Sequence, residues 1–189
     1  RSAVCRRDRR VDAIIVQNAV SHEAGLGSLW ETRRRYWANR GAHVEKLRAN
    51  LISPEVARQR HLGNDSHPEQ YDPDAWTGES AFLCRPGQAR IQEDLFYDYR
   101  TNVAAYPTWQ AYLREQQPPL LVPRGKYDPS FTVEGALAHR QDVKGAEIHV
   151  LEAGHFAMDT KSDEVSALAL KFLDKHRRWH RRQGGYGPA

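Results

Sequence analysis

Residues 120–156 read LLVPRGKYDPSFTVEGALAHRQDVKGAEIHVLEAGHF and decide the fold class. Two short aliphatic runs, at 120–122 and 147–151, are typical of buried strands. The stretch between them, residues 133–140, has a helical pattern. Parallel strands require such a crossover, so the segment predicts a strand–helix–strand unit of an α/β fold. Pro123 cannot donate to a strand ladder, and we expect it to end the first strand.

The rest of the chain extends this unit in both directions. Residues 11–16, Val-Asp-Ala-Ile-Ile-Val, predict another buried strand, preceded at 1–10 by the basic end of a helix. An amphipathic helix is predicted at 163–176. The expected organisation is a remnant of the core domain at 1–20, a helical cap at 21–117, core strands and helices at 118–176, and a basic, disordered tail at 177–189.

Residues 21–117 are rich in aromatic and polar residues and contain no strand-like run. Nearly a hundred residues are too many for a loop, so they predict a subdomain of their own. Ser53-Pro54 is a helix start, with Ser as the N-cap and Pro in the first helical position. Tyr106-Pro107 is expected to begin another helix.

Two polar motifs follow the strands at 120–122 and 147–151. Asp128 lies in Gly-Lys-Tyr-Asp-Pro, and His155 lies in Gly-His-Phe. Ligands of open α/β sheets bind beyond the carboxyl ends of the strands, where both residues fall. A carboxylate can fix the tautomer of a histidine base and stabilise its imidazolium. Taken alone, Asp-Pro after Gly is a common turn and the His could simply cap or pack, but their order and spacing predict an acid–base pair.

A nucleophile is not found in this sequence. No Gly-x-Ser-x-Gly motif occurs; Gly78-Glu79-Ser80 lacks the second glycine, and no strand leads into Ser28. The chain also begins without Met, and we expect it to be the C-terminal part of a longer enzyme.

Composition limits the partners. The net charge is +4 and the pI about 9.2, with basic residues concentrated at both ends. Such ends permit nucleic-acid binding, but no recognition motif supports it, and we expect solvated tails instead. Two cysteines, no signal peptide and no apolar run of about 20 residues predict a cytoplasmic protein without membrane contact. We expect neither a cofactor nor a metal; the oligomeric state stays open.

Several motifs together resemble the epoxide hydrolase-like family of the α/β-hydrolase superfamily, which is related to haloalkane dehalogenases. They are LFYDYRTN at 95–102, AWTG at 75–78, RPGQ at 85–88, GKYDP at 125–129, GHF at 154–156, and 11–18 followed by EAGLG at 23–27. The resemblance implies a partial α/β-hydrolase fold with a helical cap. It also implies an aspartate nucleophile shortly before Arg1, which forms a covalent ester that His155, oriented by Asp128, hydrolyses.

The resemblance further implies a small apolar substrate, which could be an epoxide, a haloalkane or an ester. Tyr99 matches the cap tyrosine that contacts an epoxide oxygen, with Tyr97 as its competitor, and Trp76 and Trp109 would line the pocket. The chain departs from the family at Pro123-Arg124, which we expect to strain the platform of the acid, and at 7–10. The alternative is a non-catalytic remnant or interaction module that retains the cap.

Overall fold

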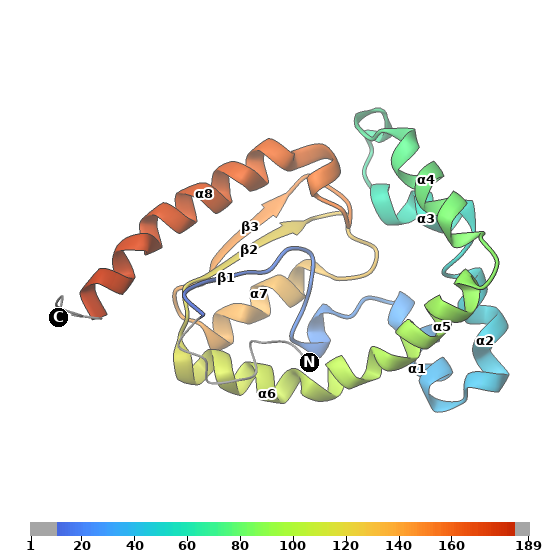
Figure 1. Cartoon of the computed structure of the whole chain (residues 1–189), viewed down its shortest axis with the longest axis horizontal. Coiled ribbons are helices and arrows are strands. Elements are labelled where there is room, and N and C mark those ends of the chain that lie inside the picture. The colour runs from blue at the N-terminus through green and yellow to red at the C-terminus, as the bar shows by residue number, and fades with distance from the viewer. Residues whose placement is uncertain (1–10, 184–189) are drawn as a thin grey trace.

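The computed structural model describes residues 11–183, with side chains as far as His176. The helix end expected at 1–10 and the last six residues lie outside the described residues. At the centre is a parallel sheet of β1 (Ile14–Ile15), β2 (Leu120–Gly125) and β3 (Glu147–Leu151), in that spatial order (Figure 1). The α/β class and the strand at 147–151 are therefore confirmed, and the strand expected at 11–16 is shorter.

Strand β2 lies between the other two and is buried along its whole length. Ile14 is in register with Leu120, and Leu121 with Glu147. A strand with neighbours on both edges and helices on both faces is usually apolar, which explains the run Leu-Leu-Val at its start.

The expectation that Pro123 ends its strand is wrong, because β2 continues through it to Gly125. The Pro123 carbonyl accepts from the Asn18 amide at 3.4 Å, on the side of β1. The amide and carbonyl of one residue in a parallel strand face the same neighbour. The missing N–H therefore faces the place where β1 has already ended at Ile15, and the ladder to β3 loses no donor.

Helices cover both faces of the sheet (Figure 1). The crossover helix α7 (Val133–Asp142) contacts β2 and β3 on one face, and α8 (Met158–Gln183) packs on the other. Backbone torsions at Lys161 are non-helical, so the first turn of α8 is kinked away from the rest. Helix α8 runs past residue 176, where we expected the core to end, as far as Gln183.

The segment between β1 and β2 is helical and is called here the insertion (residues 21–117). Ser53 caps its third helix by accepting from the Val56 amide at 3.2 Å, as predicted. The elements of the insertion are η2 (Glu23–Gly25), α1 (Leu29–Ala38), α2 (Arg40–Ala49), α3 (Pro54–Leu62), η3 (Pro68–Gln70), α4 (Pro73–Leu83), α5 (Gln88–Asp98) and α6 (Arg100–Gln116).

Pro107 does not begin a helix, contrary to expectation, but lies inside α6. A proline within a helix removes one i to i−4 hydrogen bond and usually weakens it. Here Tyr106 and Tyr112, on either side of the proline, are buried in two different clusters, which hold the helix against the rest of the molecule. Packing therefore overrides the local preference.

No helix in residues 11–183 combines the length and the apolar character that crossing a bilayer demands.

At two glycines the backbone of the insertion lies in direct contact with the backbone of the loops that follow β2 and β3. A Cβ on Gly63, which ends α3 at φ 59°, would lie 1.5 Å from the carbonyl oxygen of Tyr127. A Cβ on Gly154 would lie 1.7 Å from the carbonyl oxygen of His61. We call this pair of contacts the glycine seam. No larger residue fits at either position unless α3 moves.

Replacing Gly63 by Ala is expected to destabilise the protein by about 1–3 kcal/mol. The added Cβ would clash with the carbonyl of Tyr127, and the positive φ is unfavourable for alanine. Gly78→Ala is the matched control. Gly78 lies inside α4 with nothing within 4 Å of its Cβ position, so the change should stabilise by up to about 1 kcal/mol. Urea unfolding of both variants measures the difference, and equal midpoints would contradict the seam.

Candidate functional site

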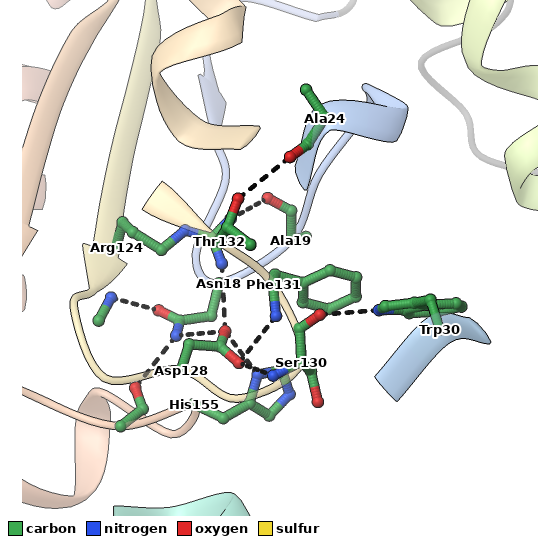
Figure 2. A network of polar contacts seen from close by, with 12 residues as sticks. Asn18, Ala19, Ala24, Trp30, Arg124, Asp128, Ser130, Phe131, Thr132 and His155 are labelled. Atoms are coloured by element: carbon green, nitrogen blue, oxygen red, sulfur yellow. Dashed lines mark hydrogen bonds and ion pairs between the residues drawn. The ribbon is translucent and has the colours of Figure 1, made fainter. Parts of the chain in front are cut away.

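The loops that follow β2 and β3 run side by side beyond the sheet. Lys126 donates its amide to the Leu151 carbonyl at 2.8 Å, and Tyr127 donates to Ala153 at 3.0 Å. This pairing brings the residue after Tyr127 next to the start of α8. As a result, Nδ1 of His155 lies 2.9 Å from Oδ2 of Asp128 (Figure 2).

Asp128 also closes its own turn. Its Oδ1 accepts from the amides of Ser130, at 2.8 Å, and Phe131, at 3.1 Å. Reading the Asp-Pro sequence as a turn was therefore correct, but it does not compete with the acid–base reading, because each carboxylate oxygen serves one of the two purposes.

Arg124 is the principal site residue that sequence reasoning misjudged. Its side chain is completely buried; Nη1 lies 3.1 Å from Oδ2 of Asp128, and Nη2 donates to the Ala19 carbonyl at 2.5 Å. We expected Arg124 to strain the platform of the acid, and the structure shows instead that it pairs with the acid. A cation at the end of a buried strand, four residues before an acid, was the available signal.

Asn18 connects the end of β1 to the same carboxylate. Its Nδ2 donates to Oδ2 of Asp128 at 3.0 Å and to the Gly154 carbonyl at 3.1 Å, and its Oδ1 accepts from the Gly125 amide at 3.1 Å. The residue adopts φ 42°, a left-handed conformation that Asn tolerates better than most residues. All three strand ends thus meet at one side chain.

These contacts favour the ionised form of Asp128 and one tautomer of His155. Burial on its own raises the pKa of Asp128, but the hydrogen bond from His155 and those from the Phe131 and Ser130 amides outweigh it and lower the pKa. An ionised carboxylate only accepts, so Nδ1 of His155 carries the hydrogen. In the neutral imidazole, Nε2 is then unprotonated and can take a proton from a reactant.

Aromatic rings line the side of His155. The Phe131 ring lies 5.8 Å from the imidazole, and the Trp30 ring 5.4 Å from Phe131. Trp30 comes from α1, and its Nε1 donates to the Ser130 carbonyl at 2.7 Å (Figure 2). An apolar wall of this kind suits an apolar ligand and keeps water away from one side of the histidine. Sequence reasoning did not single out either residue.

The four aromatic residues proposed to bind substrate lie in different places. Tyr99 packs on Trp30, with ring centroids 4.7 Å apart, and so belongs to the wall beside His155. Tyr97 packs on Tyr36 and under two arginines of the insertion, away from that wall. Trp109 stacks on Tyr106 and lines a separate cavity of about 230 Å³ near β1.

Trp76, from α4, approaches the site only through His61. The two rings lie 6.3 Å apart, and His61 in turn stacks on Phe156 at 4.6 Å. His61 also binds charge from two other elements, since Nδ1 lies 2.6 Å from Asp159 and Nε2 lies 3.3 Å from Glu79. Burial lowers the pKa of His61, but these two carboxylates prevail and the pKa is raised.

Within residues 11–183, no three histidine, cysteine or acidic side chains gather in a way that could hold a metal ion.

Comparison with known proteins relates this architecture to hydrolases. No protein-family model matches the chain. Over 169 residues it is 36% identical to an uncharacterised hydrolase, YNR064C, of Saccharomyces cerevisiae, and the match covers 87% of this chain but 57% of that protein. The chain thus spans little more than half of this relative.

Two solved structures show the fold. One is 2-hydroxy-6-oxo-6-phenylhexa-2,4-dienoate hydrolase of Rhodococcus sp. RHA1, with a TM-score of 0.59, 18% identity, and coverage of 86% of this chain and 55% of that one. The other is the meta-cleavage product hydrolase of Pseudomonas fluorescens IP01, with a TM-score of 0.62, 13% identity, and coverage of 91% and 59%. The chain has a partial α/β-hydrolase fold.

Replacing Arg124 by Met is expected to cost about 3–5 kcal/mol near neutral pH, because it leaves the Asp128 carboxylate buried without a cation. Wild-type Asp128 stabilises the fold above its unfolded pKa of 3.8, and this contribution is lost as pH falls through the lower folded value. The variant raises the folded pKa, so the stability difference should shrink on acidification. Denaturant unfolding across pH measures it.

Arg90→Met is the control for that measurement. Arg90 is exposed and pairs with Asp94 one turn along α5, so its loss should change stability by less than about 0.5 kcal/mol. If Arg124→Met behaves like Arg90→Met, the buried ion pair does not support the acid.

Replacing His61 by Gln should destabilise the protein in a pH-dependent way. The raised pKa means that protonated His61 stabilises the fold fully below its unfolded value of 6.5, and that this contribution disappears as pH rises through the folded pKa. The difference between wild type and His61→Gln should therefore be largest in mild acid and shrink toward alkaline pH. A pH-independent difference would show that His61 only packs.

Proposed function

We propose that this chain carries the acid–base half of an epoxide hydrolase-like enzyme that works through a covalent ester. The observation that carries the proposal is the His155–Asp128 pair at the carboxyl edge of a parallel sheet, in which Nδ1 of the histidine faces the carboxylate. Similarity to a hydrolase at 36% identity supports a hydrolytic reaction.

In the proposed reaction an aspartate encoded upstream of Arg1 attacks an epoxide carbon. A new carbon–oxygen bond forms, the epoxide carbon–oxygen bond breaks, and the product oxygen takes a proton. His155 then removes a proton from water, and the resulting hydroxide attacks the carbonyl of the ester. Asp128 stabilises the imidazolium that forms, because its carboxylate stays ionised in the folded protein. Collapse of the adduct releases a diol and restores the aspartate, and the imidazolium returns its proton to the group that protonated the epoxide oxygen, so both groups are regenerated.

Tyr99 is proposed as the residue that donates to the epoxide oxygen. Burial raises its pKa, so the phenol stays protonated and remains a donor. Its hydroxyl lies 3.5 Å from that of Tyr106, which can hold it in place. Tyr97 is not retained as a competitor, because its ring packs on Tyr36 instead of on the wall beside His155.

The insertion is proposed to act as a cap over a small substrate with a largely apolar body. Trp30 and Phe131 supply the apolar surface next to the base. Trp76 could contribute only through a movement of His61, and Trp109 serves the packing of α6 near β1. A cytoplasmic location is proposed with it, since Cys84 is an exposed free thiol, which suits a reducing compartment.

The alternative is a non-catalytic interaction module. It is favoured by an exposed apolar surface on α4 and α5, where Phe82 and Leu95 are each 59% exposed and Ile91 is 49% exposed. That surface lies on the insertion and does not include the acid–base pair. The enzyme hypothesis therefore requires His155, whereas the interaction-module hypothesis does not.

The test is an assay of the protein extended by its upstream coding sequence on an aryl epoxide. His155→Gln and Asp128→Asn should each lower turnover by about 10³-fold or more. His155→Gln should also accumulate the ester, seen by mass spectrometry as enzyme plus one epoxide. His67→Gln is the control, because the imidazole of His67 is exposed and lies 3.1 Å from the neighbouring Glu69.

Loss of turnover without any trapped ester would contradict the covalent mechanism. Absence of an upstream aspartate on a strand-to-helix turn, with no epoxide turnover, would leave the interaction module as the function of the chain.

A further inference from the structure

A small cavity lies between α1, α3 and the loop that carries Asp128. Its volume is about 80 Å³. One water needs roughly 10–15 Å³ of such space, so the cavity has room for a group of several heavy atoms. The residues that matter here are Leu29, Arg33, Val56, Arg60, Pro129 and Ser130.

Arg33 is the first of two cations on this cavity. It is 7% exposed, and its guanidinium lies between the rings of Trp30, at 4.3 Å, and Phe96, at 4.8 Å. Ring faces attract the cation but accept no ordinary hydrogen bond from its edge. Nη1 of Arg33 is buried and has no hydrogen-bond partner within residues 11–183.

Arg60 is the second cation. Its Nη2 is engaged, since it donates to the Leu51 carbonyl at 3.1 Å and lies 3.1 Å from Glu79. Its Nε is buried and has no partner among the described residues. Leaving a donor of a charged group buried and unpaired is costly, and native structures rarely do so without a ligand or water.

The two guanidinium groups also repel each other. Burial, followed by the charge of Arg60, lowers the pKa of Arg33 to about 10, which still leaves it protonated at neutral pH. Glu79 offsets part of the charge of Arg60, but no acidic side chain lines this cavity in the described part of the chain. An anion between the arginines would satisfy both free donors and reduce the repulsion.

The cavity adjoins the proposed catalytic pair on two sides. Pro129 and Ser130 form part of its wall and directly follow Asp128. The carbonyl of Arg60 accepts from the amide of His155 at 3.3 Å. A group bound here would therefore lie beside the loop that carries Asp128 and beside the residue whose carbonyl holds the backbone of His155.

We propose that this cavity binds a carboxylate group of the substrate. The assignment of the anion to a substrate rests on the proposed function, whereas the presence of an anion site does not. A planar guanidinium donates well to a carboxylate. Successive ring contacts link Arg33 to His155: the guanidinium lies over Trp30, Trp30 packs on Phe131, and Phe131 packs on the imidazole. The substrate class is thus an apolar molecule with one acidic end.

The first experiment is calorimetric titration of the protein with sodium acetate and, separately, with acetamide, its uncharged analogue of the same shape. Acetate should bind saturably and acetamide should not. Arg33→Met should weaken acetate binding by about 10-fold or more, because one charged donor is removed. Arg35→Met is the matched control, since Arg35 lies on the same helix, is exposed and pairs with Glu31.

Equal binding of acetate and acetamide, or no saturable acetate binding, would overturn the proposal, and neither result needs a variant that folds. If Arg33→Met loses its far-ultraviolet circular dichroism, Arg33→Lys replaces it. The lysine retains the charge but lacks the planar fork, so it should keep weak acetate binding and still reject acetamide. Acetate binding unchanged in a folded Arg33 variant would also overturn the proposal.

The second experiment separates this inference from the proposed function. His155→Gln should abolish turnover and leave acetate binding unchanged. In the extended enzyme, KM for an aryl epoxide bearing a carboxylate should rise about 10-fold in Arg33→Met, with no change for the carboxamide. Acetate binding without epoxide turnover would sustain the anion site and overturn the epoxide reading. Epoxide turnover in which Arg33→Met changes KM equally for both substrates would sustain the epoxide reading and overturn the assignment of the cavity to the substrate carboxylate.

Discussion

The carboxylate of Asp128 and the guanidinium of Arg124 are both completely buried, 3.1 Å apart. Two charges removed from water cost several kcal/mol each unless every remaining donor and acceptor is matched. The partners of the carboxylate come from the ends of all three strands: Asn18 after β1, the turn amides after β2, and His155 after β3. On the guanidinium, Nη1 and Nη2 are bonded, while Nε has no partner among the described residues. The carboxylate can therefore stay ionised only while the sheet keeps its register. Stability of the sheet and readiness of the site are, for this reason, a single requirement.

Sequence reasoning succeeded where the determinants are local. The strands at 120–122 and 147–151, the cap at Ser53, and the closeness of Asp128 to His155 follow from short patterns and from the geometry of parallel strands. It failed where the partner is distant. From sequence alone, a buried Arg124 predicts a strained strand end, because its partners, Asp128 and the Ala19 carbonyl, are identified only in the structure. From sequence alone, Pro123 predicts the end of a strand, because the position at which β1 ends is not known. Pro107 likewise predicts the start of a helix, because the burial of Tyr106 and Tyr112 is not known.

The choice between Tyr97 and Tyr99 could have been sharpened from sequence. Residues two apart on a helix are separated by about 200° around its axis, so both rings cannot face the same wall. The structure places Tyr99 with Trp30 and Tyr97 with Tyr36. Which of them packs on Trp30 depends on how the end of α5 and the start of α6 lie against α1, and no local pattern in the sequence encodes that packing. The same limit hid Trp30 and Arg33, since helix α1 reads as a charged surface helix.

The glycine seam has a consequence for how this protein can diverge. Gly63 lies against the carbonyl of Tyr127, and Gly154 lies against that of His61. Tyr127 directly precedes Asp128, and Gly154 directly precedes His155. A lineage can exchange the rings and arginines of the insertion one at a time and explore new ligands while the seam holds. A change at either glycine displaces the insertion together with the loops that carry Asp128 and His155, so it would survive only after compensating substitutions elsewhere. Ligand preference in such lineages should therefore drift early, and the seam should change late.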